Sequence, residues 1–277
     1  MAIYAMQTKA VPFDKQRASF ITHLNYIRCL KKILSEASIS VSTRGSFIKN
    51  DEEVNRFRNL FRLTKMSLAT DIRLARHNPA FAIIVAPWFP VKCYYALYYL
   101  ESILIHLADG SNQGFTRGGH TSVRKVIYTH ITTNLINFTI TDLSSVYSLA
   151  SIDALPPIPS GSNTSSGFWE QPQCISSLLK KLKEYKVHNQ MLSQKWNLHR
   201  KKDREEKNRF IAREKISLLD FFYWYRIKAN YRDLDYIDFE NGISEAEVLC
   251  YLEEFNNAFE LYKDLLEHEV DRMLKLE

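Results

Sequence analysis

The residues best suited to chemistry lie near the end of the chain, in FYWYRIKANYRDLDY at 222–236. Arg226 is surrounded by aromatic residues and is followed by Asn230 and Asp233. On a helix, spacings of four and seven residues place these three polar side chains on roughly one face. Arginine stays protonated and contacts phosphate through two N–H groups. Two interpretations are open: a recognition site for phosphate or base, and an arginine paired with Asp233 or with an acid of the last helix.

A second set of side chains suited to chemistry precedes Arg226 in the sequence. A tyrosine-rich segment at 91–107 is followed by a glycine-rich connection that ends at His120. Histidine acts as a general acid or base near neutral pH. The alternative is that His120 only caps the helix that follows it.

A basic stretch, HRKKDREEKNRFIAREK, covers 199–215 and holds eight Lys/Arg, one His and four Asp/Glu. Charges that alternate at i and i+4 are typical of a solvated helix. The other interpretation is a phosphate-contacting face in which Arg200, Lys201 and Lys202 bind substrate. Such contacts supply affinity without sequence specificity.

The sequence has no HExxH, GxGxxG or GKS/GKT motif and no Ser or Cys nucleophile motif, so we expect no metal and no cofactor. Its cysteines, Cys29, Cys93, Cys174 and Cys250, show no paired spacing. They fit reduced thiols in a cytoplasmic protein.

Charge is distributed unevenly. Residues 233–277 hold fourteen Asp/Glu and three Lys/Arg, whereas the rest of the chain holds 34 basic and 17 acidic residues. This polarity favours a polyanion partner on one surface, or association between copies of the chain. The apolar segment at 79–108 is interrupted by prolines and charges, which predicts a buried helix and no membrane span.

Helical periodicity and low glycine and proline content predict an all-α fold. We expect a helix after Asp14, one from Asn50 to the residues before Pro79, one over 91–107, and one starting near Thr121. A polar helical segment, as one helix or two, should cover about 174–215, and a last helix should start at the capping box of Ser244 and Glu247. Residues 39–47 predict a loop or short hairpin, and the Pro/Ser-rich residues 152–173 a flexible or extended connector.

Over residues 91–131 and 218–266 the chain resembles the HEPN superfamily. The matching stretches are CYYALYYLESILIHLADG, GGHTSVRKVI and YWYRIKANYRDLDY with the acidic helix that follows. The resemblance implies an antiparallel HEPN-like helical bundle over 91–277, interrupted by the connector at 152–173 and the basic helix at 174–215. Residues 1–90 would be an N-terminal helical elaboration.

Many members of this superfamily are ribonucleases of toxin–antitoxin or antiviral systems. The resemblance therefore implies a metal-independent endoribonuclease that acts on RNA, with an antitoxin or defence-system protein as a partner. It implies a homodimer in which Arg226 of each copy lines a shared cleft. Arg226, His120 and Tyr231 would be catalytic, with Asn230 and Asp233 binding substrate.

One feature departs from the family. Its catalytic members carry an arginine followed, after four to six residues, by a histidine, but Tyr231, Arg232 and Asp233 stand at those distances from Arg226. The alternative function is a non-catalytic subunit or scaffold that binds protein or nucleotide through the same cleft.

The required spacing occurs elsewhere, in Arg17 with His23 and in Arg124 with His130. Residues six apart point about 120° away from one another on a helix. Arg124 and His130 lie in the resembling region and are the better candidates for substrate contacts.

Overall fold

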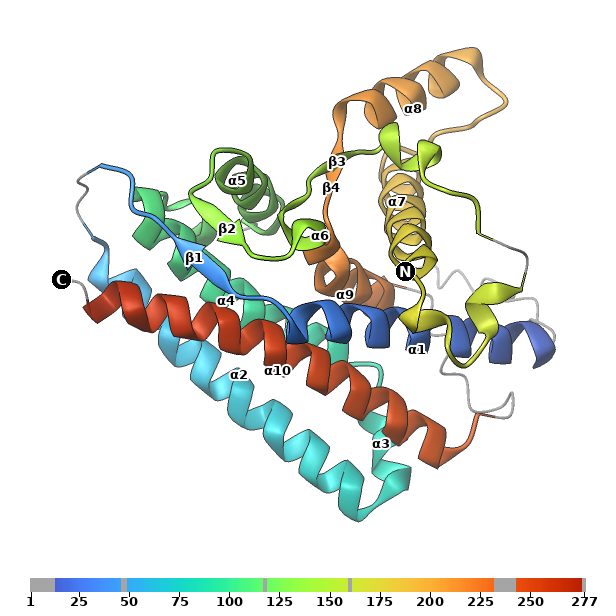
Figure 1. The fold of residues 1–277 in the computed structure, drawn as a ribbon, viewed down its shortest axis with the longest axis horizontal. Coiled ribbons are helices and arrows are strands. Elements are labelled where there is room, and N and C mark those ends of the chain that lie inside the picture. Colours follow the sequence, from blue (N-terminus) through green and yellow to red (C-terminus); the bar gives the residue numbers. More distant parts are fainter. Residues whose placement is uncertain (1–12, 46–48, 117–118, 159–160, 232–242, 276–277) are drawn as a thin grey trace, which may run out of the picture.

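A computed structural model of the chain describes residues 13–45, 49–116, 119–158, 161–231 and 243–275. It is mostly helical, which confirms the all-α prediction (Figure 1). The helices are α1 (Phe13–Ser35), α2 (Asp51–His77), α3 (Pro79–Val85), α4 (Phe89–Asp109), α5 (His120–Thr132), α6 (Thr141–Ser144), α7 (Gln173–Ser193), α8 (Lys201–Arg213), α9 (Phe221–Tyr231) and α10 (Glu245–Lys275). Short 3₁₀ turns are η1 (Gln113–Phe115), η2 (Ser151–Ala154), η3 (Ser162–Thr164), η4 (Phe168–Glu170) and η5 (Leu218–Asp220).

Helix α4 forms the centre of the molecule. Almost all of its side chains are buried, because apolar residues occupy every face of the helix rather than one stripe. Helices α2, α9 and α10 all contact α4, and α2 runs antiparallel to α10 beside it (Figure 1). The helix ends at Gly110, whose φ of 75° is left-handed and suits glycine.

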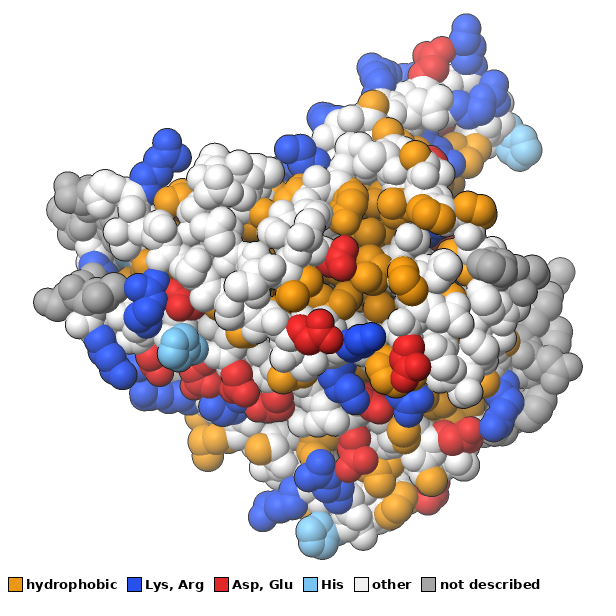
Figure 2. Space-filling model, viewed as in Figure 1, with side chains coloured by type: hydrophobic (Ala, Val, Ile, Leu, Met, Phe, Trp, Pro, Cys, Tyr) orange, Lys and Arg blue, Asp and Glu red, His pale blue; other side chains and the backbone are white. Residues whose placement is uncertain are grey.

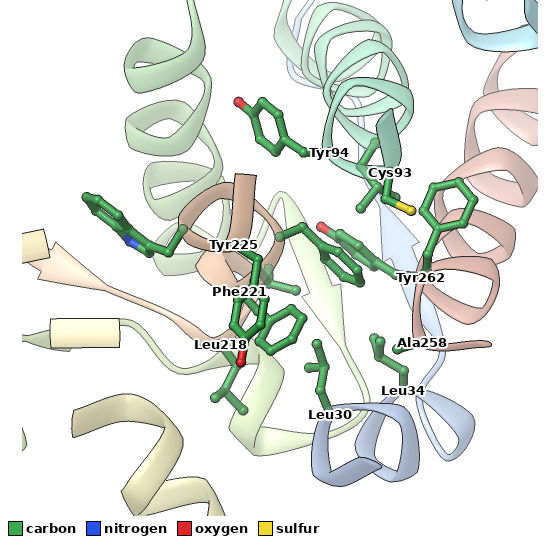
Figure 3. Close-up of a cluster of buried hydrophobic side chains, with 14 of the residues drawn as sticks. Leu30, Leu34, Cys93, Tyr94, Leu218, Phe221, Tyr225, Ala258 and Tyr262 are labelled. Atoms are coloured by element: carbon green, nitrogen blue, oxygen red, sulfur yellow. The ribbon is translucent and has the colours of Figure 1, made fainter. Parts of the chain in front are cut away.

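Side chains of four helices meet in the core (Figure 3). Leu30 and Leu34 of α1 lie opposite Phe221 and Tyr225 of α9, while Tyr262 comes from α10 and Cys93 from α4. Helix α1 contacts α10, and α2 contacts α4. Helices before and after residue 90 thus pack against each other, and the predicted division of the chain at residue 90 stays a prediction.

Two helices begin at the capping residues that the sequence predicts. The Asn50 side chain accepts a hydrogen bond from the Glu53 N–H at 3.2 Å, and α2 ends at His77, before Pro79. The Ser244 N–H donates to the Glu247 carboxylate at 2.9 Å, while the Glu247 N–H donates to Ser244 Oγ at 3.3 Å. Both predicted caps are confirmed, because each depends on residues three apart in the chain.

Acidic side chains of α10 pair within the chain. Glu253 binds Arg76 at 2.8 Å, Glu254 binds Arg28 at 3.0 Å, and Glu267 binds Lys65 at 3.0 Å. The cations come from α1 and α2, so the acidic helix is neutralised by its own neighbours. Exposed basic residues without such partners among the described residues include Lys125 of α5 and Lys215 of β4.

One local expectation needs correction, and two further features were not determined by the sequence. Of residues 39–47 the structure describes 39–45: β1 (Ile39–Val41) pairs antiparallel with the distant β2 (Ile136–Phe138) instead of forming a local hairpin, and a loop follows it. The basic segment at 174–215 is two helices, α7 and α8, separated at Gln194–Arg200. A second small sheet joins β3 (Tyr147–Ser148) to β4 (Lys215–Ile216).

The connector at 152–173 is partly packed, since Phe168 is fully buried and Asn25 donates to two of its carbonyls, at 2.9 Å each. Within the described residues, no single helix is both long and apolar enough to cross a membrane. Helices α3 and α4 together have the length and composition, but they are bent by 62°.

Candidate functional site

Arg226 lies on α9 against tyrosines of α4. Its guanidinium carbon is 4.9 Å from the centre of the Tyr94 ring and 5.4 Å from that of Tyr223. Its Nη1 donates to the Tyr95 hydroxyl at 3.4 Å. Among the described residues no carboxylate lies within ion-pair distance of this arginine, and its buried Nε has no hydrogen-bond partner. Arg226 is half-buried and held by ring faces, so its charge is not neutralised there.

His120 begins α5 and reaches the same tyrosines. Its Nδ1 lies 2.9 Å from the Tyr94 hydroxyl, and its ring centre lies 4.3 Å from that of Tyr98. Gly119 makes this approach possible. A Cβ there would lie 2.5 Å from the Gln113 carbonyl oxygen and 3.0 Å from the Tyr98 hydroxyl, closer than side-chain atoms tolerate. The structure thus brings His120 and Arg226 together through Tyr94, although they are distant in sequence.

The electrostatics of the site keep His120 neutral. Burial, and then the nearby Arg226 guanidinium, lower the pKa of His120 from 6.5 to about 4. Burial also raises the pKa of the Tyr94 hydroxyl, so that Tyr94 stays protonated. Above about pH 5 the site therefore offers a neutral imidazole beside one fixed positive charge. A neutral imidazole can accept a proton and the arginine can contact a phosphate, but a pKa near 4 makes His120 a weaker base at neutral pH than a histidine whose pKa lies near 7.

We expect a titration of the His120 ring resonances by NMR to give a pKa near 4 in the wild type. Arg226→Met should raise this pKa without restoring 6.5, because burial is the larger of the two causes. Arg56→Met removes another ring-stacked arginine, 4.9 Å from the Phe57 ring centre, and should leave the His120 pKa unchanged. A wild-type pKa of 6.5 would refute the electrostatic description of the site.

The same shift has a consequence for folding. The unfolded chain binds a proton at position 120 between about pH 6.5 and pH 4, whereas the folded chain does not. Stability should therefore fall as the pH falls through this window. His120→Asn removes the titration, so its unfolding midpoint should depend less on pH there than that of the wild type.

The Arg124–His130 pair is arranged differently. Arg124 is 5% exposed, forms an ion pair with Glu101 and donates to the Leu219 carbonyl at 3.1 Å. His130 is 2% exposed, and its Nε2 lies 2.7 Å from Asp109. The two side chains point in different directions from α5 and contact different carboxylates, as their six-residue spacing predicts. These partners favour packing roles over substrate contacts.

The other sequence-selected residues are dispersed. Arg17 pairs with Glu247 at 2.9 Å, whereas His23 is buried and its Nδ1 lies 2.7 Å from the Tyr225 hydroxyl. Arg200, Lys201 and Lys202 are exposed at the start of α8, away from α4. The geometry does not add them to the group around Arg226.

Asn230 and Tyr231 end α9, and the structure describes only their backbone. Asp233 lies outside the described residues, so the predicted pairing of Arg226 with Asp233 stays a prediction. The roles predicted for Asn230 and Tyr231 stay predictions as well.

The residues that sequence reasoning missed are the tyrosines that join the two predicted side chains. Tyr94 and Tyr98 stand four apart and share a helix face, and Tyr95 and Tyr223 complete the surroundings of Arg226. The repeated YY pairs in CYYALYYL were the available signal. Their helical spacing predicts a buried face equally well, which is why pattern alone did not select them.

Within the described ranges no group of three or more His, Cys, Asp or Glu residues is placed to hold a metal ion. No protein-family model, curated protein or solved structure gives a significant match to this chain. The HEPN resemblance therefore rests on its motifs alone.

Proposed function

We propose that this chain binds RNA at His120 and Arg226 and cleaves it without a metal ion. The observation that carries the proposal is a histidine held neutral beside an arginine that has no carboxylate neighbour among the described residues. An arginine kept for stability alone is usually paired with a carboxylate when it is partly buried. Stacking on tyrosine rings instead leaves the guanidinium N–H groups available to phosphate oxygens.

The cleavage step uses the ribose itself as the nucleophile. The 2′-hydroxyl oxygen forms a bond to the adjacent phosphorus, and the bond from phosphorus to the 5′ oxygen breaks. His120 accepts the 2′-hydroxyl proton, which its Nε2 can do when Nδ1 carries the ring proton and donates to Tyr94. Arg226 neutralises the charge that develops on the phosphate. The departing 5′ oxygen takes a proton from solvent or from Tyr231, and the products are a 2′,3′-cyclic phosphate and a 5′-hydroxyl.

The same proposal includes an HEPN-like bundle that works as a homodimer. What supports it is the order of the tyrosine-rich α4, the histidine-led α5 and the arginine-bearing α9 before the acidic α10. Sedimentation of the purified chain should give twice the monomer mass, and a monomer that cleaves RNA would remove the dimer from the proposal. An antitoxin or other defence-system protein stays a proposed partner.

Cleavage of a labelled single-stranded RNA in the presence of EDTA tests the chemistry. kcat/KM should stay constant from neutral pH down to about pH 5 and fall only as His120 acquires its proton near pH 4. His120→Ala should lower the rate by about 10²–10⁴, the usual contribution of a general base. His268→Ala, on the exposed side of α10, is the matched control and should have no effect.

A second function is favoured by a specific observation, the absence of histidine at the family spacing after Arg226. A binding-only protein would hold RNA with salt-sensitive affinity and release no products. If the wild type binds RNA but forms no cyclic phosphate at any pH tested, the binding function replaces the catalytic one.

A further inference from the structure

A pocket of about 730 Å³ opens next to the candidate site, between α5, α7, α8, β4 and α9. Thr121, the residue after His120, lines it, and so does Tyr223, whose ring contacts Arg226 at 5.4 Å. The pocket therefore shares a wall with the candidate site. In the space-filling view the outline is recessed between α5 and the projecting α8, which carries a cluster of Lys and Arg side chains (Figure 2).

The charge that lines this pocket is positive. Its acidic residues are engaged: Glu214 lies 3.2 Å from Lys186 and 3.4 Å from Arg213, and Asp220 accepts from the buried Ser217 N–H at 2.9 Å. The exposed Lys125 and Lys215 also line the pocket, and within the described part of the chain neither has a carboxylate at ion-pair distance. Two uncompensated ammonium groups, one on α5 and one on β4, suit the phosphates of a polyanion.

The remaining lining suits the other parts of a nucleotide. Tyr223 is the half-buried aromatic residue of the lining, whereas Tyr128, Phe210 and Trp224 are each more than 90% buried and offer little accessible ring surface. The threonines of α5 supply neutral hydroxyl groups. Aromatic rings stack on any base, so such a site holds nucleic acid without reading its sequence. An acidic peptide would need the cations but not this aromatic surface.

The pocket also continues along α8. A second pocket, of about 450 Å³, shares Gln190, Phe210 and Arg213 with the first and reaches Trp196 and Lys202. An aromatic residue and a cation thus recur one pocket further on. Two adjoining pockets of this kind can hold successive phosphates and bases of one strand. A single nucleotide would fill only one of them.

We propose that the pocket between α5 and α8 binds the nucleotides of a single-stranded RNA next to the one held at His120 and Arg226, with Lys125 and Lys215 on its phosphates. This inference rests on the proposed function for the identity of the strand. It assigns a role to α8, which the resemblance to known helical ribonucleases does not cover.

The test measures binding of a 12-nucleotide 2′-O-methyl oligouridylate, which lacks the attacking hydroxyl and stays intact. Lys125→Gln with Lys215→Gln should weaken binding at least tenfold at moderate salt. It should also reduce the slope of log affinity against log salt by about 1.4, since each phosphate contact on a single strand contributes about 0.7. The matched control is Arg62→Gln with Arg73→Gln, two exposed cations of α2 with no carboxylate at ion-pair distance among the described residues. It should leave affinity and slope unchanged.

Two further probes separate the outcomes. A 2′-O-methyl uridine dinucleotide has a single internucleotide phosphate. With that phosphate at Arg226, its affinity should fall in Arg226→Ala but stay unchanged in the lysine variant. If Arg226→Ala does not weaken dinucleotide binding but the lysine variant still weakens 12-nucleotide binding, the proposed cleavage site is wrong and the pocket proposal stands. Unchanged 12-nucleotide affinity in the lysine variant would overturn the pocket alone. If uridine monophosphate binds as tightly as the 12-nucleotide strand, the pocket is a mononucleotide site and the strand path is wrong.

Discussion

Replacing Arg226 by alanine should lower the rate of RNA cleavage by about 10²–10³, the usual loss when one donor to a developing oxyanion is removed. The unfolding midpoint should stay nearly unchanged. Among the described residues Arg226 has no ion pair to lose, its buried Nε has no partner, and its hydrogen bond to Tyr95 is long at 3.4 Å. Cleavage kinetics and thermal unfolding of the same preparation measure both quantities.

Two variants make this result interpretable. Arg226→Lys keeps the charge but loses bidentate contact with phosphate, so its cleavage rate should lie between those of the wild type and Arg226→Ala. Arg62→Ala removes an exposed arginine of α2 that has no carboxylate at ion-pair distance among the described residues, and it should leave cleavage unaffected. An Arg226→Ala protein that unfolds readily, or one that cleaves normally, would show that the arginine serves structure and not chemistry.

Arg124→Met should cause the largest loss of stability, about 3–5 kcal/mol, because it leaves buried carboxylates without their cation. Glu101 pairs with Arg124 and also accepts from the Tyr262 hydroxyl at 3.0 Å, and Asp220 lies 4.0 Å from Arg124. These groups come from α4, α5, η5 and α10, so the network joins the elements that carry the candidate site. Urea unfolding followed by circular dichroism gives the free energy.

A double variant separates the ion pair from simple packing. Adding Glu101→Leu to Arg124→Met removes the carboxylate that the single variant leaves without its cation. The double variant should therefore lose less free energy of unfolding than the two single variants lose in sum. Arg62→Met, on an exposed face of α2, should change stability by less than about 0.5 kcal/mol. Additive losses at 101 and 124 would show that the two residues act independently.

The helix boundaries were predictable from the sequence because their causes are local. Asn50 with Glu53 and Ser244 with Glu247 satisfy backbone groups within a single turn. Proline at 79 ends α2 for an equally local reason. The short strand pairs were missed because β1 and β2 are joined only through a long intervening chain, and their three-residue length leaves no alternating pattern to detect.

The sequence by itself determined the helical class, the two capped helices and the selection of Arg226 and His120 as chemically interesting side chains. Only the tertiary structure decided their partners. It joined these two through Tyr94, paired Arg124 with the buried Glu101 and His130 with the half-buried Asp109, and neutralised acids of α10 with cations of α1 and α2. The physical reason is that a helix sets which residues share a face, whereas the neighbour of that face is set by packing between distant segments. Charge and reactivity depend on that neighbour.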